Sequence, residues 1–318
     1  MTTEQRQVEL ATGISMHVWE EGAGPAVVFV HGFPELGYSW RHQLPAVSLA
    51  GMRAIAPDMR GYGKTTAPPR VEDYQHRLIC DDLVSLLDAE GLAEAVFVGH
   101  DWGGAIVWAM ALHHPSRVRA VAGINTPYRG QPPAPLLEMV KDRPGAWDYQ
   151  FYFQEPGVAE AELEADAERT LRLMLRSSDP VDRLDALGGT SSVRERGGIL
   201  VGLPDDAPRS VMLTAEDLRV FAEAFGASGF RGPLNWYRND RANWEWGEAT
   251  KTARIGCPAL MVTAGKDPVL KPSLSEGMEQ VIPQLQRGHI EECGHWTQQE
   301  RPEELNQILV DWLGGLRE

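Results

Sequence analysis

Short apolar runs alternate with stretches of helical periodicity through much of this chain, and this alternation constrains its fold most. Continuous apolar runs of strand length suit strands that are buried on both faces of a sheet. Such runs fall at Ala26–Val30, Arg53–Ala56, Ala95–Val98, Val118–Ile124 and Ala259–Thr263. Strands that alternate with helices pair in parallel through right-handed crossovers. The chain is therefore expected to form an α/β fold, with a mostly parallel central sheet and helices on both faces.

Two segments between these runs predict helices. Apolar residues recur at helical spacing over residues 78–87, and we expect Asp81, Asp82 and Asp88 on that helix to face water. Ala105–His114 is apolar on nearly every side, which predicts a buried helix. A last helix is expected from about Pro302 to Leu313.

The alternation breaks after Pro127 and returns only near Ala259. The intervening stretch is long, acidic and helix-rich, and we expect its acidic run Glu160–Glu168 to be a solvated helix face. An interrupted alternation predicts a sheet domain with an inserted helical lid. The expected boundaries are 1–130 for the first part of the core, 131–246 for the lid, and 247–318 for the second part of the core.

The most specific motif is Val98-Gly99-His100-Asp101-Trp102-Gly103-Gly104, between a predicted strand and a predicted helix. Glycines two residues before and after Asp101 permit a strained turn that lifts the central side chain above the sheet, at a helix N-terminus. This is the geometry of a nucleophile elbow. An aspartate at this position can also simply cap the following helix, and the motif alone leaves both interpretations open.

Two other segments favour the catalytic interpretation. His295 follows the last predicted strand, and histidine is the natural base near neutral pH. Asp267 follows the strand at Ala259–Thr263 and could orient that histidine. The chain order of nucleophile, acid and histidine is typical of α/β hydrolases. The backbone N–H groups of Phe33 and Trp102 could then form an oxyanion hole.

A carboxylate nucleophile narrows the reaction class. A carboxylate can displace a leaving group from saturated carbon and form an alkyl ester, which histidine-activated water then hydrolyses. Epoxides and haloalkanes both suit this displacement. An epoxide oxygen needs acidic donors, whereas a halide needs a cradle of N–H groups.

Over nearly its whole length the chain resembles the soluble epoxide hydrolases of the α/β-hydrolase superfamily, in particular the hydrolase domain of the mammalian soluble enzymes. The matching stretches are His31–Glu35, Arg60–Gly63, Gly99–Gly104, Tyr149–Gln150 with Phe153–Gly157, Gly232–Asn239, and Gly288–Glu291 with Gly294–Trp296. The resemblance implies an α/β-hydrolase fold with an inserted lid. It also implies conversion of epoxides to vicinal diols through a covalent ester on Asp101.

In that family two lid tyrosines hold and protonate the epoxide oxygen, and by motif position these would be Tyr149 and Tyr237. A neutral phenol is a suitable proton donor. Packing with a solvent-facing hydroxyl is the alternative for both, and Tyr152 is a nearby competitor for the first role. The resemblance further implies that Gln150, together with Phe33 and Trp102, lines the substrate pocket.

Two rival functions stay open at this stage. A haloalkane dehalogenase shares the fold and also has tryptophan after the nucleophile, but typically has asparagine where Phe33 stands and lacks the tyrosine pair. A non-catalytic receptor on this fold often lacks a member of the triad, whereas Asp101, Asp267 and His295 are all present.

The composition of the chain excludes some classes of binding partner and indicates where the protein is found. The formal net charge of −15 argues against binding to nucleic acid or to an anionic membrane surface. The N-terminus shows no secretory signal, and no apolar run is long enough to span a bilayer. Three cysteines fit a reducing compartment, so a cytoplasmic protein is expected. We expect a monomer or homodimer that uses no cofactor and no metal, with an epoxide and water as its partners.

Overall fold

The computed structural model describes residues 3–184 and 189–316, and an eight-stranded sheet forms the centre of this part of the chain. The strand order is β1-β2-β4-β3-β5-β6-β7-β8. The strands are β1 Glu4–Glu9, β2 Ser15–Gly22, β3 Ala26–Val30, β4 Arg53–Pro57, β5 Ala95–His100, β6 Val118–Ile124, β7 Ala259–Ala264 and β8 Leu285–Ile290. β2 pairs antiparallel with both β1 and β4, and all other pairs are parallel. The predicted α/β-hydrolase fold is confirmed.

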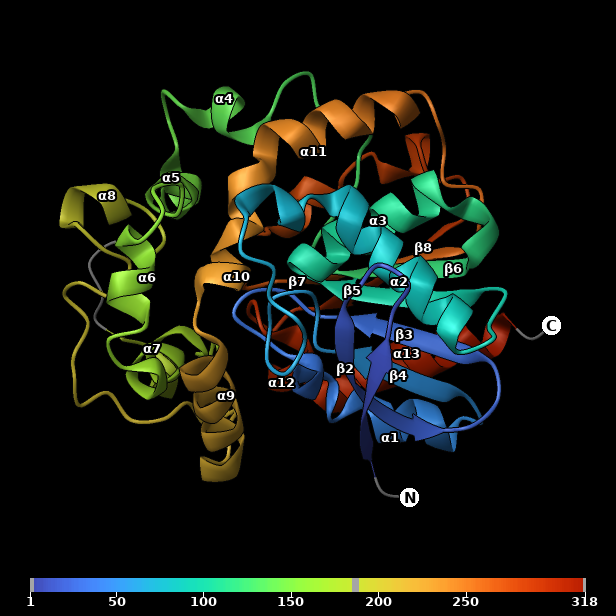
Figure 1. The fold of residues 1–318 in the computed structure, drawn as a ribbon, viewed down its shortest axis with the longest axis horizontal. Coiled ribbons are helices and arrows are strands. Elements are labelled where there is room, and N and C mark those ends of the chain that lie inside the picture. The colour runs from blue at the N-terminus through green and yellow to red at the C-terminus, as the bar shows by residue number, and fades with distance from the viewer. Residues whose placement is uncertain (1–2, 185–188, 317–318) are drawn as a thin grey trace.

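Helices cover both faces of the sheet (Figure 1). α1 (Gln43–Leu49) and α13 (Pro302–Gly315) contact each other on one face, while α2 (His76–Ala89) and α3 (Trp102–His113) lie on the other. Alternate residues of each buried strand supply the two cores, because successive side chains of a strand point to opposite faces. Val27 packs in the core under α1 and α13, whereas Val28 packs in the core under α2 and α3.

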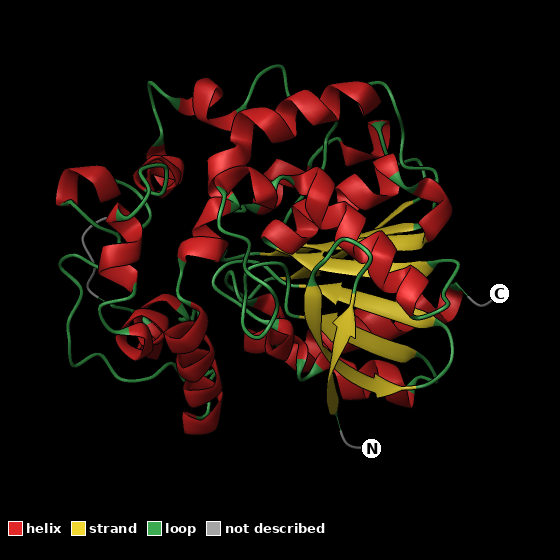
Figure 2. Ribbon diagram, in the orientation of Figure 1, coloured by secondary structure: helices red, strands yellow, loops and turns green. Residues whose placement is uncertain are grey.

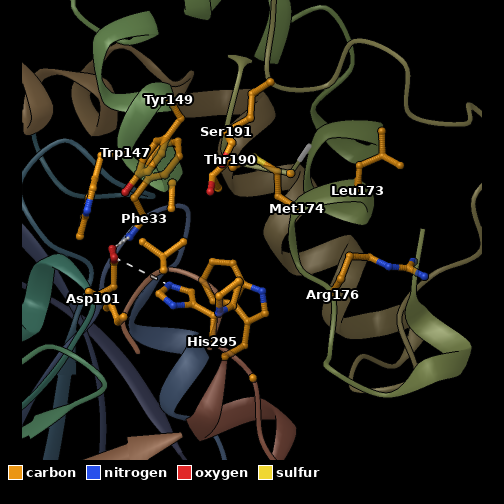
Figure 3. Close-up of a pocket in the computed structure, with 18 of the residues that line it drawn as sticks. Phe33, Asp101, Trp147, Tyr149, Leu173, Met174, Arg176, Thr190, Ser191 and His295 are labelled. Atoms are coloured by element: carbon orange, nitrogen blue, oxygen red, sulfur yellow. Dashed lines mark hydrogen bonds and ion pairs between the residues drawn. The ribbon is translucent and has the colours of Figure 1, made fainter. Parts of the chain in front are cut away.

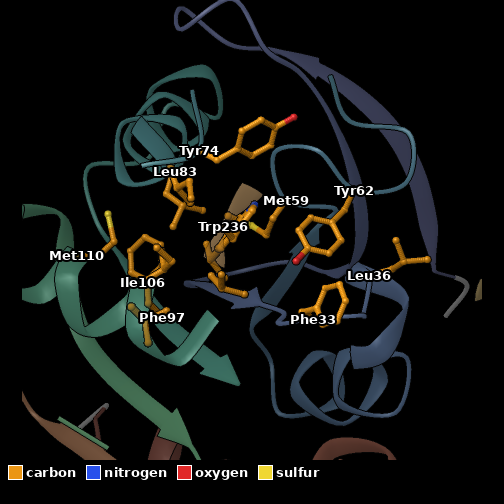
Figure 4. Packing of buried hydrophobic residues seen from close by; sticks show 14 of the residues in the cluster. Phe33, Leu36, Met59, Tyr62, Tyr74, Leu83, Phe97, Ile106, Met110 and Trp236 are labelled. Atoms are coloured by element: carbon orange, nitrogen blue, oxygen red, sulfur yellow. The ribbon is translucent and has the colours of Figure 1, made fainter. Parts of the chain in front are cut away.

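The larger of the two cores lies beneath α2 and α3. Figure 4 shows Phe97 of β5 packed with Ile106 and Met110 of α3 and with Leu83 of α2. Trp236, from far along the chain, reaches the same core and donates a hydrogen bond from Nε1 to the carbonyl of Arg60 at 3.1 Å. The segment that carries Trp236 is thereby fixed to the sheet domain.

Between β6 and β7 the described residues form helices and loops without a strand (Figure 2). The helices are α4 Leu136–Val140, α5 Asp148–Tyr152, α6 Val158–Leu163, α7 Ala167–Met174, α8 Val193–Arg196, α9 Ala215–Ser228, α10 Arg231–Asn235 and α11 Asp240–Gly247. The short α12 (Thr297–Glu300) precedes α13. No helix within residues 3–184 and 189–316 combines the length and apolar content that crossing a membrane requires.

Two expectations about acidic residues are wrong. Asp82 is fully buried rather than facing water, and its carboxylate pairs with Arg60 at 2.7 Å. Glu160, in the run expected to be a solvated face, is buried and pairs with Arg238 at 2.7 Å. Glu164 accepts a hydrogen bond from the backbone N–H of Phe230 at 2.7 Å. Partners distant in sequence thus cover Asp82 and Glu160, whereas Glu164, Asp166 and Glu168 are exposed as expected.

Candidate active site

The turn between β5 and α3 places Asp101 at the site (Figure 3). Asp101 has φ 53° and ψ −121°, a left-handed conformation that is costly for a residue with a side chain. The turn is tight, since a methyl group on Gly103 would overlap the carbonyl oxygen of Val30. The Asp101 side chain makes no capping hydrogen bond to α3, so the interpretation of Asp101 as a helix cap is wrong.

His295 and Asp267 come to the same place from the ends of two other parallel strands. His295 Nε2 lies 3.8 Å from Asp101 Oδ2, and His295 Nδ1 lies 2.8 Å from Asp267 Oδ2. Asp267 is 3% exposed. The structure thus brings together all three residues of the expected triad.

The charges of this cluster are strongly coupled. Burial opposes ionisation of Asp267, but His295 and the hydrogen bonds from Asn125 and from the backbone hold the pKa of Asp267 well below its ordinary value. Burial likewise disfavours the imidazolium, but Asp267 above all, with Asp101, raises the pKa of His295 to about 9. His295 therefore carries a proton near neutral pH.

A backbone N–H group contacts the Asp101 carboxylate, and a helix begins next to it. The Phe33 N–H donates to Asp101 Oδ1 at 2.9 Å. The loop comes this close because residue 32 is glycine; a methyl group there would overlap the Asp101 side chain. Trp102 is the first residue of α3, where backbone N–H groups and the helix dipole favour negative charge.

The two predicted tyrosines line the same cavity. Tyr149 belongs to α5, and Tyr237 begins a 3₁₀ helix at Tyr237–Asn239; their ring centroids are 5.9 Å apart. Tyr237 is 3% exposed, so its hydroxyl does not face solvent. Burial above all, with the charge of Asp101, raises the pKa of Tyr149 and of Tyr237 above the ordinary value. Both phenols are therefore neutral proton donors at neutral pH.

Gln150 and Tyr152 both follow Tyr149 closely in the sequence, but their side chains have different surroundings. The Tyr152 hydroxyl donates to Glu162 at 3.0 Å, away from the cavity lining. The Gln150 side chain lines the cavity and donates to the Tyr149 hydroxyl at 3.3 Å. The geometry thus favours Tyr149 over Tyr152 at this site.

The cavity has a volume of about 810 Å³ and extends well beyond Asp101 and His295. Figure 3 shows Tyr149 across the cavity from Asp101, with Met174, Leu173 and Arg176 farther from Asp101. Most residues that line the cavity belong to the segment between β6 and β7. A mostly apolar cavity of this size accommodates a small organic molecule.

Sequence reasoning missed several polar residues behind the triad. Asn125, with φ 63°, directly follows β6 and donates from Nδ2 to Asp267 Oδ2 at 2.8 Å. His100 lies between the Glu35 carboxylate at 2.9 Å and the His295 carbonyl at 2.7 Å. The position of Asn125 just after a buried strand was a usable signal. The Glu35–His100 pair had none, because these residues meet only in the folded chain.

The chain is similar to known proteins that share this fold. A profile described as the alpha/beta hydrolase fold matches residues 25–302. The chain is 50% identical over 307 residues to bifunctional epoxide hydrolase 2 of Sus scrofa, a match that covers 96% of this chain and 54% of the pig protein. The chain thus spans about half the length of that relative.

Two mycobacterial proteins match along almost their full length. Epoxide hydrolase A of Mycobacterium tuberculosis is 40% identical over 309 residues, covering 96% of this chain and 95% of that protein. The crystal structure of epoxide hydrolase A from Mycobacterium thermoresistibile superposes with a TM-score of 0.88 at 40% identity, and covers 99% of both chains.

Proposed function

The chain belongs to the α/β-hydrolase family and groups with its epoxide hydrolases, and on this premise we propose that it converts epoxides to vicinal diols through a covalent ester on Asp101. The observation that carries the proposal is one cavity that joins a carboxylate on a strained elbow, a histidine 3.8 Å from it, and two neutral phenols. The proposed substrates are a small-molecule epoxide and water.

In the first step an oxygen of Asp101 attacks an oxirane carbon. The carbon–oxygen bond of the ring breaks, and a phenol proton from Tyr149 or Tyr237 passes to the departing oxygen. The product of this step is a hydroxyalkyl ester of Asp101. A halide needs no such proton, so the phenol pair favours an epoxide over a haloalkane as the substrate.

Formation of the ester changes the electrostatics of His295. The negative charge of Asp101 helps to keep the imidazole protonated, and the ester is neutral. The pKa of His295 therefore falls once the ester forms, and the imidazole passes its proton to the phenolate left by the first step and becomes a base. One residue pair thus couples the end of the first step to the start of the second.

In the second step water attacks the ester carbonyl while His295 Nε2 takes its proton. The developing oxyanion is stabilised by the N–H groups of Phe33 and Trp102. Collapse of the intermediate breaks the ester bond, and the diol oxygen takes the proton from His295. The Asp101 carboxyl group, which now holds one oxygen from water, then passes its remaining proton to His295, and this restores the carboxylate and the imidazolium. We also propose that residues 131–246 act as a lid, supported by their contribution to the cavity walls.

Trapping the ester tests the proposal. The variant His295→Gln is incubated with a panel of epoxides, and the intact protein is weighed. We expect a substrate-sized adduct on Asp101 that accumulates in the variant and turns over in the wild type. Halide release from haloalkanes without diol formation, or the absence of adduct across the panel, would reject the proposed function.

Wild-type enzyme gives a second test. Enzyme equilibrated in heavy-oxygen water by turnover and then moved to ordinary water should give labelled diol on its first turnover, because the diol takes an oxygen from Asp101. Unlabelled diol would show direct attack of water on the epoxide.

A further inference from the structure

The two phenols are carried by segments far apart in the chain, and one side chain joins these segments. Gln154 Nε2 donates to the backbone carbonyl of Gln150 at 2.8 Å and to that of Tyr237 at 3.0 Å. Gln150 directly follows Tyr149 in α5, and Tyr237 carries the second phenol itself. A single amide group therefore uses both of its N–H bonds to link the two phenol-bearing segments.

The end of α5 explains why this carbonyl is available. The backbone N–H of Gln154 bonds to the carbonyl of Phe151 at 3.2 Å instead of to that of Gln150, four residues back. Helix ends leave carbonyl groups without a partner inside the helix. The Gln154 side chain bonds to this carbonyl, and its remaining N–H reaches Tyr237.

We propose that Gln154 is a positioning residue that sets the spacing and aim of the two phenols; this rests on the proposed function of the site. Phe153, next to Gln154, contacts both rings from the side, with centroids 5.5 Å from Tyr149 and 5.0 Å from Tyr237. Neither contact of Phe153 is directional in the way a hydrogen bond is. The hydrogen bonds of the amide therefore constrain how the two backbones face each other.

A second tie keeps the two segments together when Gln154 is changed. Arg238 donates from Nε to the carbonyl of Phe153 at 2.9 Å, and pairs with Glu160 at 2.7 Å. Loss of the Gln154 amide is thus expected to shift the phenols locally rather than to detach the segments. A displacement of about 1 Å in a positioned group can cost on the order of 100-fold in rate.

The test separates the two chemical steps, because the phenols serve only the first. Rapid mixing with an epoxide that gives a measurable ester, followed by quenching and weighing of the protein, yields the rate constants for ester formation and for ester hydrolysis. In Gln154→Leu we expect ester formation to fall by about 10- to 100-fold. Ester hydrolysis should stay within about twofold of the wild type.

Gln131→Leu is the matched control. Gln131 is also half-buried, and its amide also donates to a backbone carbonyl, that of Trp244 at 2.7 Å, but it does not join the phenol segments. We expect both rate constants of this variant to stay near those of the wild type. Gln154→Glu, which keeps the length of the side chain but has no N–H, provides a second variant should the leucine substitution unfold the protein.

A double variant asks whether Gln154 acts through the phenols. In a Tyr237→Phe background, Gln154→Leu should cost less than about threefold in ester formation, because one of the two positioned donors is already absent. Three results would overturn the positioning role of Gln154 and leave the proposed function standing. These are an equal fall of both rate constants in Gln154→Leu, an unchanged rate of ester formation in that variant, or effects of Gln154→Leu and Tyr237→Phe that are fully additive. A wild type that forms no ester would instead overturn the proposed function, and the role of Gln154 with it.

Discussion

The proton on His295 links activity and stability at the scale of a single residue. Its pKa in the folded protein is about 9, above the ordinary value of about 6.5 that holds in the unfolded chain. A group whose pKa is raised by folding stabilises the fold fully below its unfolded pKa, and this stabilisation is lost as the pH rises through the folded pKa.

Denaturant unfolding of the wild type and of His295→Gln, at several pH values, measures this effect. We expect the stability of the wild type relative to the variant to decrease between about pH 6.5 and pH 9, by on the order of 3 kcal/mol. Other titrating groups cancel in the difference between the two proteins. A difference that does not change with pH would show that Asp267 and Asp101 do not hold the proton on His295.

Asn125 provides the second prediction at this scale. Its amide donates to Asp267, and its φ of 63° suits glycine as well as asparagine. Asn125→Gly keeps the backbone unstrained and removes only the amide. We expect ester hydrolysis to slow by about 10-fold, since Asp267 then orients His295 less well.

The measurement for Asn125→Gly is the amount of ester present at steady state. Because ester formation does not use His295 as a base, the ester should accumulate in this variant. Asn125→Ala should show the same kinetic effect and, in addition, a loss of about 1 kcal/mol in stability from its positive φ. Slower ester formation in Asn125→Gly would contradict the assignment.

At the scale of elements, the elbow depends on close contact between β3, β5 and α3. A methyl group on Gly103 would overlap the carbonyl oxygens of Val30 and His31, and these belong to backbone that cannot easily move away. We expect Gly103→Ala to lower the free energy of unfolding by about 3 kcal/mol and to move Asp101 from its place. Chemical denaturation and the yield of adduct measure the two effects.

Gly226 supplies the control for this prediction. It lies inside α9, and a methyl group there would meet no atom within 4 Å. Gly226→Ala should stabilise the protein by about 0.5–1 kcal/mol, because alanine has the higher helix propensity. If both alanine variants were equally stable, the tight packing of the elbow would not be what constrains residue 103.

Buried strands can be predicted from the sequence more closely than the short helices between β6 and β7. β6 begins and ends at the predicted residues, and β4 and β7 extend each by one residue, because an apolar run between polar ends marks a buried strand. The short helices between β6 and β7 could not be bounded in this way. Helices of four to eight residues, such as α8 and α7, are unstable alone, and tertiary contacts decide where they end.

The residues of the site also divide into those that the sequence predicts and those that only the structure reveals. The residues on strand ends, Asp101, Asp267 and His295, follow from motif and chain order, because the fold places such ends along one edge of the sheet. Gln154 and Glu300 act through backbone groups of distant segments. No pattern of residue types records such a contact, so these two could be found only in the folded structure.

At the scale of the whole molecule, one carboxylate connects the inserted helices to the loop that carries His295. Glu300, in α12, is buried and accepts hydrogen bonds from the Ser178 N–H at 3.0 Å and from the Gly294 N–H at 3.1 Å. Ser178 lies among the inserted helices and lines the cavity, and Gly294 precedes His295. The cavity wall and the loop that carries His295 are therefore held by the same side chain.

Glu300→Gln tests this connection, because glutamine has one acceptor oxygen where the carboxylate has two. The Ser178 hydroxyl also donates to Glu300. The N–H₂ group of the glutamine would face the backbone N–H of either Ser178 or Gly294, so one of these two backbone hydrogen bonds must be lost. We expect a loss of about 1.5–3 kcal/mol, the usual worth of a hydrogen bond to a charged group. Amide hydrogen exchange should become faster at residues 176–182 and 293–296 together, while exchange within β5 and β6 stays unchanged.

Glu303→Gln is the control for this prediction. Glu303 is exposed in the first turn of α13, and its substitution should change neither the stability nor the exchange rates. Faster exchange at only one of the two segments would mean that the inserted helices and the His295 loop move independently and are not coupled through Glu300.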